Sequence, residues 1–123
     1  TAHAEVTTIR VACMELGVFN LGAIKKSDSN LTQPGNSSHC IIYSSSEPCP
    51  MCYAAISWAR IPQLIFAATR YDAAVQGVSF SDEEIYAEMD RHYSERKMKV
   101  FQSSTNNSLD AFNLWKRSPK IRY

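Results

Sequence analysis

Apolar residues recur at every third or fourth position between residues 3 and 16. This spacing predicts an amphipathic helix over residues 3–16. Gly17 follows directly, and glycine readily adopts the left-handed conformation with which many helices end. Residues 27–38 are almost entirely polar and include Pro34 and Gly35, so we predict a solvated loop there.

Two short apolar runs flank a second helical segment. Residues 40–43 and 64–68 are rich in β-branched, aromatic and small apolar side chains, which predicts two buried strands. Between them, Pro50 suits the first turn of a helix and Pro62 ends it. Strand, helix and strand within about thirty residues form a βαβ unit, in which the two strands are parallel. We therefore predict an α/β fold.

The last third of the chain has weaker patterns. Residues 81–92 begin with acidic side chains after Ser81, which predicts a helix with Ser81 as its N-cap. Residues 97–102 alternate loosely and predict a third strand. Leu109, Phe112 and Trp115 recur at helical spacing and predict a final helix. No repeat and no internal boundary is visible, so we expect residues 1–123 to form a single domain.

Composition narrows the class of protein. The chain has 123 residues, of which 45% are hydrophobic, and a net charge of +1. It lacks the positive excess of a typical nucleic-acid-binding domain, so we do not expect a nucleic-acid partner. Neither a membrane-spanning run nor a signal-peptide pattern is visible, and we expect a cytoplasmic protein without membrane attachment. Because the chain begins at Thr1 rather than at Met, we expect part of the protein to be missing from it.

Four cysteines allow two interpretations. An even number is compatible with two disulfides in a secreted protein. However, Cys49 and Cys52 form a Cys-x-x-Cys motif at a predicted helix start, where two thiolates can share one face. We therefore favour reduced thiols that bind a metal. Cys13 and Cys40 belong to apolar patterns, and we expect them in the core.

His3 combines with these two cysteines into a set typical of zinc. Two thiolates and one imidazole leave the fourth position of a tetrahedral Zn²⁺ open, which is the pattern of catalytic sites. Zinc bound in this way lowers the pKa of a bound water to about 7. Glu5 is two residues from His3 and, at a helix start, both side chains can turn toward one point. A structural zinc site, or no metal at all, is the alternative.

The motif His-x-Glu, followed by Pro-Cys-x-x-Cys at residues 48–52, resembles the zinc nucleobase deaminases of the cytidine and deoxycytidylate deaminase superfamily. Within this superfamily the chain is most similar to the guanine deaminase branch. The residues that carry this similarity are 54–60, 72–74, Gly77, 80–86 and 121–123. The resemblance covers nearly the whole chain.

The resemblance implies a three-layer α-β-α fold with a mixed or mostly parallel sheet, in which a helix and two strands precede Thr1. It implies one zinc ion per chain, held by His3, Cys49 and Cys52. Glu5 would take a proton from water and deliver it to a ring nitrogen and to the leaving ammonia. The substrate would be a small purine base, first of all guanine, which would give xanthine and ammonia.

The resemblance also implies a set of substrate-binding residues: Ala4, Trp58, Phe80, Asp82, Asn106 and Tyr123. Tyr123 matches a terminal tyrosine that closes the pocket, in some relatives the pocket of the partner subunit, by exchange of the C-terminal segment. We therefore expect a homodimer. Asn106 aligns with a glutamate that pairs with the guanine edge in this branch, and Asp110 is the nearest acidic residue.

Several alternatives remain open at this point. A tRNA adenosine deaminase shares both motifs but would need a basic groove for RNA. A guanosine deaminase or a pyrimidine deaminase is compatible with the same zinc ligands. A non-catalytic zinc-binding interaction module is the alternative from another class, and it would follow if the protein truly lacks the strands before Thr1.

Overall fold

The structure of the chain is a computed structural model that describes residues 2–78 and 82–119. It divides into two compact units, Thr1–Met89 and Asp90–Tyr123, which are described one after the other. A single deaminase domain over residues 1–123 stays a prediction. None of the described helices is long and apolar enough to cross a membrane.

The first unit is built around a parallel pair of strands. β3 (Ile41–Ser46) and β4 (Gln63–Ala68) lie side by side, with Ile42 opposite Leu64 in their register. The helix α2 (Pro50–Trp58) connects them. Pro50 occupies its first turn, as its missing N–H group allows. The predicted βαβ unit with parallel strands is confirmed, and with it the α/β class.

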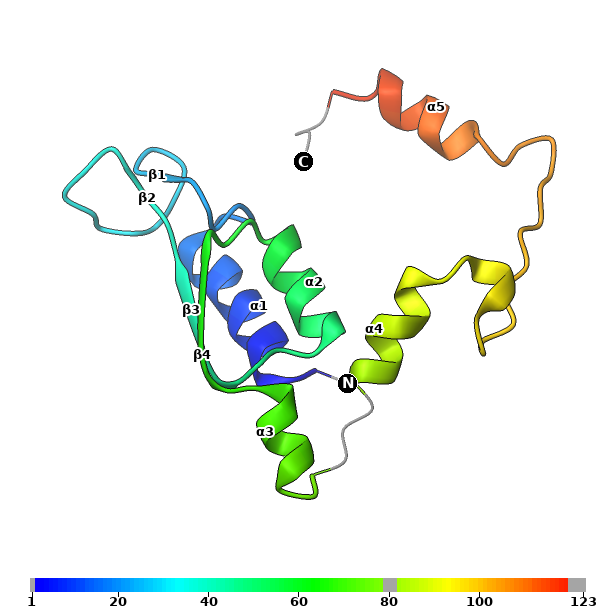
Figure 1. Cartoon of the computed structure of the whole chain (residues 1–123). Coiled ribbons are helices and arrows are strands. Elements are labelled where there is room, and N and C mark those ends of the chain that lie inside the picture. The colour runs from blue at the N-terminus through cyan, green and yellow to red at the C-terminus, as the bar shows by residue number, and fades with distance from the viewer. Residues whose placement is uncertain (1, 79–81, 120–123) are drawn as a thin grey trace. The chain divides into compact units, whose positions relative to one another are not determined.

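The helix α1 (Ala4–Leu16) packs against α2, and both lie on the same side of the strand pair (Figure 1). Gly17 ends α1 with φ of 70°, the left-handed conformation that its sequence position predicts. The core between helices and strands is formed by Ile9, Leu21, Ile24, Ile42, Ile56 and Ala59. Cys13 and Cys40 pack against this core as free thiols, which confirms their predicted place.

The two faces of β3 differ in exposure. Ile42 points into the core and is 6% exposed, whereas Ile41 and Tyr43 on the other face are 40% and 69% exposed. Alternation of this kind follows from the period of two of a β-strand. The outer face of β3 therefore presents large apolar side chains that the described residues leave exposed.

The segment after α1 is more ordered than its composition predicts. β1 (Ile24–Lys25) pairs antiparallel with β2 (Ser37–Ser38), so the end of the expected loop 27–38 belongs to a small ladder. The side chain of Gln33 is buried and contacts both strands. Its amide nitrogen donates to the carbonyl of Ile24 at 3.2 Å, and its amide oxygen accepts a hydrogen bond from the Ser38 hydroxyl. A buried side chain thus anchors this polar segment, which hydrophobic patterning does not detect.

Two helices follow β4. α3 (Arg70–Val75) was not predicted, because its six residues contain no apolar stripe. It depends instead on a capping box, in which Thr69 and Asp72 each bind the other's backbone N–H group. α4 (Asp82–Asp90) confirms the predicted helix but ends before residues 91 and 92. The expected N-cap, Ser81, lies outside the described residues.

The second unit holds a 3₁₀ turn, η1 (Tyr93–Glu95), and the final helix α5 (Asp110–Arg117), which confirms the predicted last helix. The strand predicted at 97–102 is wrong: this segment has no regular structure. A strand forms only when a partner supplies ladder hydrogen bonds, and no described strand pairs with this segment. Phe112 and Trp115 of α5 are 64% and 43% exposed.

Candidate active site

The first turns of α1 and α2 bring the candidate ligands together. His3 is the N-cap of α1 and Cys49 is the N-cap of α2, both with extended backbone (ψ of 163° and 166°). Neither side chain makes a capping hydrogen bond to its own helix. Both are therefore available to point away from the helix axes, and Cys52 follows one turn later in α2.

The three side chains form a compact cluster with metal-ligand spacing. His3 Nδ1 lies 3.4 Å from Cys49 Sγ and 3.5 Å from Cys52 Sγ, and the three ligand atoms lie within 4.8 Å of one another. Nitrogen and sulfur ligands of one tetrahedral zinc ion, at about 2.0 and 2.3 Å from the metal, are about 3.5 Å apart. The cluster therefore fits zinc in donor type and in spacing, as the sequence predicts.

Burial distinguishes the two thiols. Cys52 is fully buried, and this burial raises its pKa to about 12, with further contributions from Cys49 and Glu5. Without a metal ion, a thiol with a pKa this high is neutral at neutral pH. A thiolate is the form that binds zinc, so metal binding must release this proton.

Glu5 lies at the edge of the cluster. Its Oε2 accepts a hydrogen bond from Cys52 Sγ at 3.5 Å, and its Oε1 accepts one from the Ser44 hydroxyl at 3.2 Å. The side chain therefore turns toward the same point as His3, although the two residues are only two apart in the sequence. Glu5 is half-buried and is held from the strand β3 on one side and from α2 on the other.

Ser44 is a site residue that sequence reasoning missed. It is one of three consecutive serines at residues 44–46, and exposure alternates along β3 so that Ile42 and Ser44 share the inward face. A hydroxyl that follows a buried isoleucine on the inward face is the signal that could have identified it. Only the packing of α1 on the sheet shows that its partner is Glu5.

The expected substrate-binding residues have different positions. Ala4 is the exposed first residue of α1, next to His3. Trp58 is the last residue of α2 and is 72% exposed, six residues after Cys52 and thus about 9 Å further along the helix axis. Phe80 and Tyr123 lie outside the described residues.

Asp82 begins α4 and lines a small pocket of about 50 Å³ together with Glu47 and Arg70. This volume is far below the roughly 300–1,000 Å³ of small-molecule sites, so the pocket by itself does not hold a purine. Asn106 lies in the turn before α5 in the second unit, and Asp110 is the first residue of that helix.

Comparison with known proteins supports a zinc site at this cluster. The sequence profile of the cytidine and deoxycytidylate deaminase zinc-binding region matches residues 1–68, which include all three candidate ligands. Guanine deaminase of Bacillus subtilis is 40% identical over 116 residues, 94% of this chain. The tRNA-specific adenosine deaminase of Agrobacterium fabrum is 40% identical over 82 residues, 65% of this chain.

A solved structure is similar as well. The X-ray structure of guanine deaminase from Bacillus subtilis matches 99% of this chain with a TM-score of 0.78 and 39% identity. The chain spans 63% of the length of the curated guanine deaminase and 43% of that of the tRNA-specific adenosine deaminase. The profile match covers more than half of the chain and includes its metal-binding cluster, and the chain therefore belongs to the cytidine and deoxycytidylate deaminase family with its zinc-binding region.

Proposed function

We propose that the protein is a zinc-dependent aminohydrolase that converts guanine and water into xanthine and ammonia. The observation that carries this proposal is the carboxylate of Glu5 beside a three-ligand cluster of His3, Cys49 and Cys52. The purine, and guanine in particular, is supported by the 40% identity with the guanine deaminase of Bacillus subtilis. The reaction would belong to purine metabolism.

His3, Cys49 and Cys52 would hold the metal, which supplies a Lewis acid that activates water when it is bound. Glu5 would act as the proton carrier: its carboxylate would accept one proton from water and deliver it to the ring nitrogen. It would then accept the second proton of the same water and deliver it to the departing amino group, which leaves as ammonia. Ser44 would keep this carboxylate in place through its hydrogen bond to Oε1. Trp58, Ala4 and Asp82 remain proposed substrate contacts, as do Phe80, Asn106 and Tyr123.

A substrate panel tests this proposal. We expect the zinc-loaded chain to convert guanine, with little dependence on salt, when it is offered guanine, guanosine, adenine, adenosine, cytosine, cytidine and tRNA. Ammonia release and mass spectrometry of the product would measure this. Conversion of cytidine or tRNA without conversion of guanine would contradict the proposed substrate while leaving the zinc chemistry intact.

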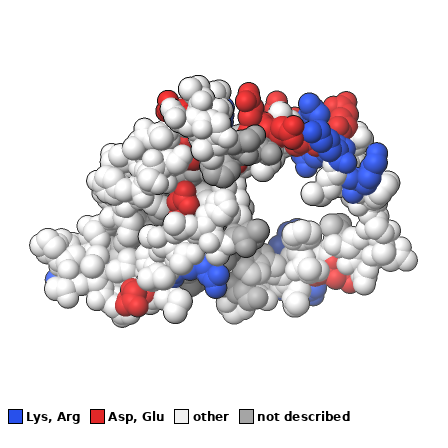
Figure 2. Space-filling model, turned by 90° about the horizontal axis from the view of Figure 1, so that it is seen from below, with Lys and Arg blue, Asp and Glu red and all other residues white. Residues whose placement is uncertain are grey.

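The second candidate is deamination of adenosine in tRNA, which the Agrobacterium fabrum relative supports. A polynucleotide substrate needs several phosphate contacts, and its affinity falls steeply with salt. The chain has a net charge of +1, and the face drawn in Figure 2 carries acidic as well as basic side chains. The balanced net charge thus favours a free base, and the tRNA arm of the panel decides between the two substrates.

Ser44→Ala should lower turnover without loss of zinc. A hydrogen bond to a charged group is worth about 1.5–3 kcal/mol, which corresponds to roughly 10- to 100-fold in rate if the bond is needed in the transition state. Because the hydroxyl acts on Glu5 and not on the metal, we expect kcat to fall with the zinc content unchanged. Ser44→Thr keeps the hydroxyl and is the matched control; equal kcat for wild type and Ser44→Ala would contradict this role.

We further propose that the protein is a homodimer in which the C-terminal segment can reach the partner's site. Phe112 and Trp115 on α5, and Ile41 and Tyr43 on β3, are large apolar residues that stay exposed in the single chain. Light scattering at micromolar concentration should give twice the 13.8 kDa of one chain. A mass of one chain would contradict the dimer.

We also propose a cytoplasmic location, because a site with two zinc-binding thiolates is best preserved in a reducing compartment. Fractionation of cells that produce the protein would test this.

A further inference from the structure

Glu47 precedes Pro48 and Cys49, and it contacts the end of the strand β4 and the start of the helix α3. Ser46 and Ala68 are the last paired residues of β3 and β4, so the segments that follow the two strands emerge side by side. The backbone N–H of Glu47 donates to the carbonyl of Ala68 at 2.7 Å. Glu47 thus continues the contact between the strands at the point where the chain turns toward Cys49.

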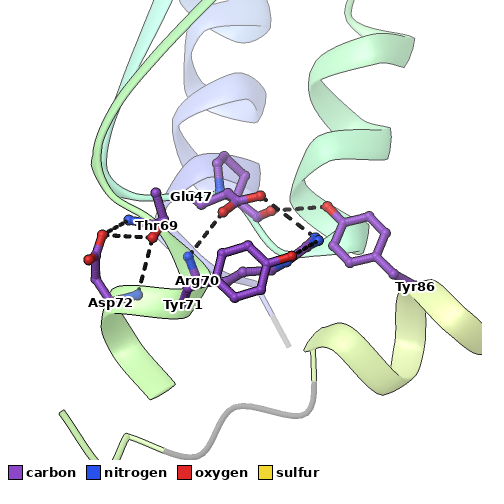
Figure 3. Close-up of polar contacts among 7 residues, drawn as sticks. Glu47, Thr69, Arg70, Tyr71, Asp72 and Tyr86 are labelled. Atoms are coloured by element: carbon purple, nitrogen blue, oxygen red, sulfur yellow. Dashed lines mark hydrogen bonds and ion pairs between the residues drawn. The ribbon is translucent and has the colours of Figure 1, made fainter. Parts of the chain in front are cut away.

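The side chain of Glu47 makes a second link. Its Oε2 accepts a hydrogen bond from the backbone N–H of Arg70 at 3.0 Å, and its Oε1 lies 3.7 Å from Nη1 of the same residue (Figure 3). The two side chains are about a quarter exposed (24% and 28%), and an ion pair of this length and exposure contributes little. The charge-assisted bond to the backbone is therefore the stronger of the two links.

Arg70 in turn lies between two aromatic rings. Its guanidinium carbon is 4.9 Å from the ring centre of Tyr86 on α4 and 5.0 Å from that of Tyr71. The Tyr86 hydroxyl donates to the carbonyl of Pro48 at 3.4 Å (Figure 3). Burial and, after it, the charge of Glu47 raise the pKa of Tyr86, so this hydroxyl stays protonated as a donor.

The Arg70 guanidinium is not fully satisfied by this arrangement. Its Nε is buried and has no hydrogen-bond acceptor within the described residues. The contacts with Glu47, Tyr71 and Tyr86 nevertheless keep the guanidinium beside the segment between Glu47 and Cys49.

We infer that Glu47, supported by Arg70, is a positioning residue for the metal ligand Cys49. Only Pro48 separates the two, and its ring restricts the backbone dihedral φ, so a displacement of Glu47 is passed on to the Cys49 thiol. Outer contacts that orient metal ligands are typically worth about 10- to 100-fold in metal affinity. This inference rests on the metal centre of the proposed function, but not on the identity of the substrate.

The test measures Co²⁺ binding to the full chain by competition with a chelator, together with the visible and thiolate-to-cobalt absorption bands. Glu47→Ala should weaken Co²⁺ affinity about tenfold or more and alter these bands. Glu47→Gln keeps an acceptor for the Arg70 N–H, so its Co²⁺ affinity and its absorption bands should be close to those of wild type. Arg70→Ala should have a smaller effect of the same kind. Glu15→Ala, which removes an exposed carboxylate on α1, is the matched control and should bind like wild type.

Far-UV circular dichroism establishes that each variant is folded. Glu47→Ala with affinity within twofold of wild type and unchanged bands would overturn the inference, as would Glu47→Gln that binds as weakly as Glu47→Ala. If Glu47→Ala does not fold, Glu47→Asp decides by the same criterion, because its shorter side chain withdraws the acceptor from the Arg70 backbone N–H. A wild-type chain that binds no Co²⁺ would instead refute the metal centre itself, so the two failures are distinguishable.

Discussion

Glu5→Gln is expected to keep the fold and the zinc ion but to lose most of its turnover. Glutamine has the same size and can still accept the hydrogen bond that Ser44 donates, but an amide cannot carry a proton. A single general acid–base group typically contributes about 10²–10⁴ in rate. Because Glu5 would serve several proton transfers in succession, we expect a loss of at least this size.

The measurement is ammonia release from guanine by protein of verified zinc content. Glu15→Gln is the matched control, since it changes an exposed glutamate on the same helix and should leave turnover near that of wild type. A zinc-loaded Glu5→Gln variant that releases ammonia at nearly the wild-type rate would rule out Glu5 as the proton carrier.

Cys49→Ala and Cys52→Ala are each expected to abolish stable zinc binding and, with it, all turnover. Either change leaves two protein ligands of the three that lie within 4.8 Å of one another. Cys52 is fully buried, so its loss also opens a cavity next to the site and should lower thermal stability more than the loss of half-buried Cys49 does.

Metal analysis of the purified variants measures this result. Cys40→Ala is the control, because Cys40 is a free thiol that packs against the core rather than in the ligand cluster. It should retain one zinc ion per chain. Full zinc stoichiometry in both Cys49→Ala and Cys52→Ala would refute the proposed ligand set.

The metal cluster could be predicted because its residues depend on local structure. His3 and Cys49 are N-caps, and Glu5 and Cys52 follow within one turn of the same helices, so two short motifs determine most of the geometry. The βαβ unit was predictable for a similar reason, since two apolar runs and two prolines mark its strands and the ends of its helix. Only the packing of α1 against α2, which brings the two motifs together, could not be predicted from these local patterns.

The contacts around the cluster could not be predicted, because they join residues far apart in the sequence. Ser44 meets Glu5 across 39 positions, and Glu47 meets Arg70 across 23. Serine in a strand and arginine after a strand are ordinary surface residues by composition. The role of Ser44 appears only once α1 packs on the sheet, and that of Arg70 appears only once the parallel register places the ends of β3 and β4 together.

The predictions for residues 97–102 and 27–38 differ from the structure for a common physical reason. The segment 97–102 alternates like a strand but finds no described partner, and a strand without a ladder is not stable. The polar segment 27–38 contains a strand that depends on the buried amide of Gln33. In both cases hydrogen bonds, and not hydrophobic periodicity, decide the structure.

The most direct test of the metal centre is X-ray absorption spectroscopy at the zinc edge on the purified chain. Binding by His3, Cys49 and Cys52 predicts one zinc ion per chain with two sulfur neighbours at about 2.3 Å and nitrogen or oxygen neighbours at about 2.0–2.1 Å. A spectrum without sulfur neighbours, one with four of them, or a chain that binds no zinc would contradict the centre described here.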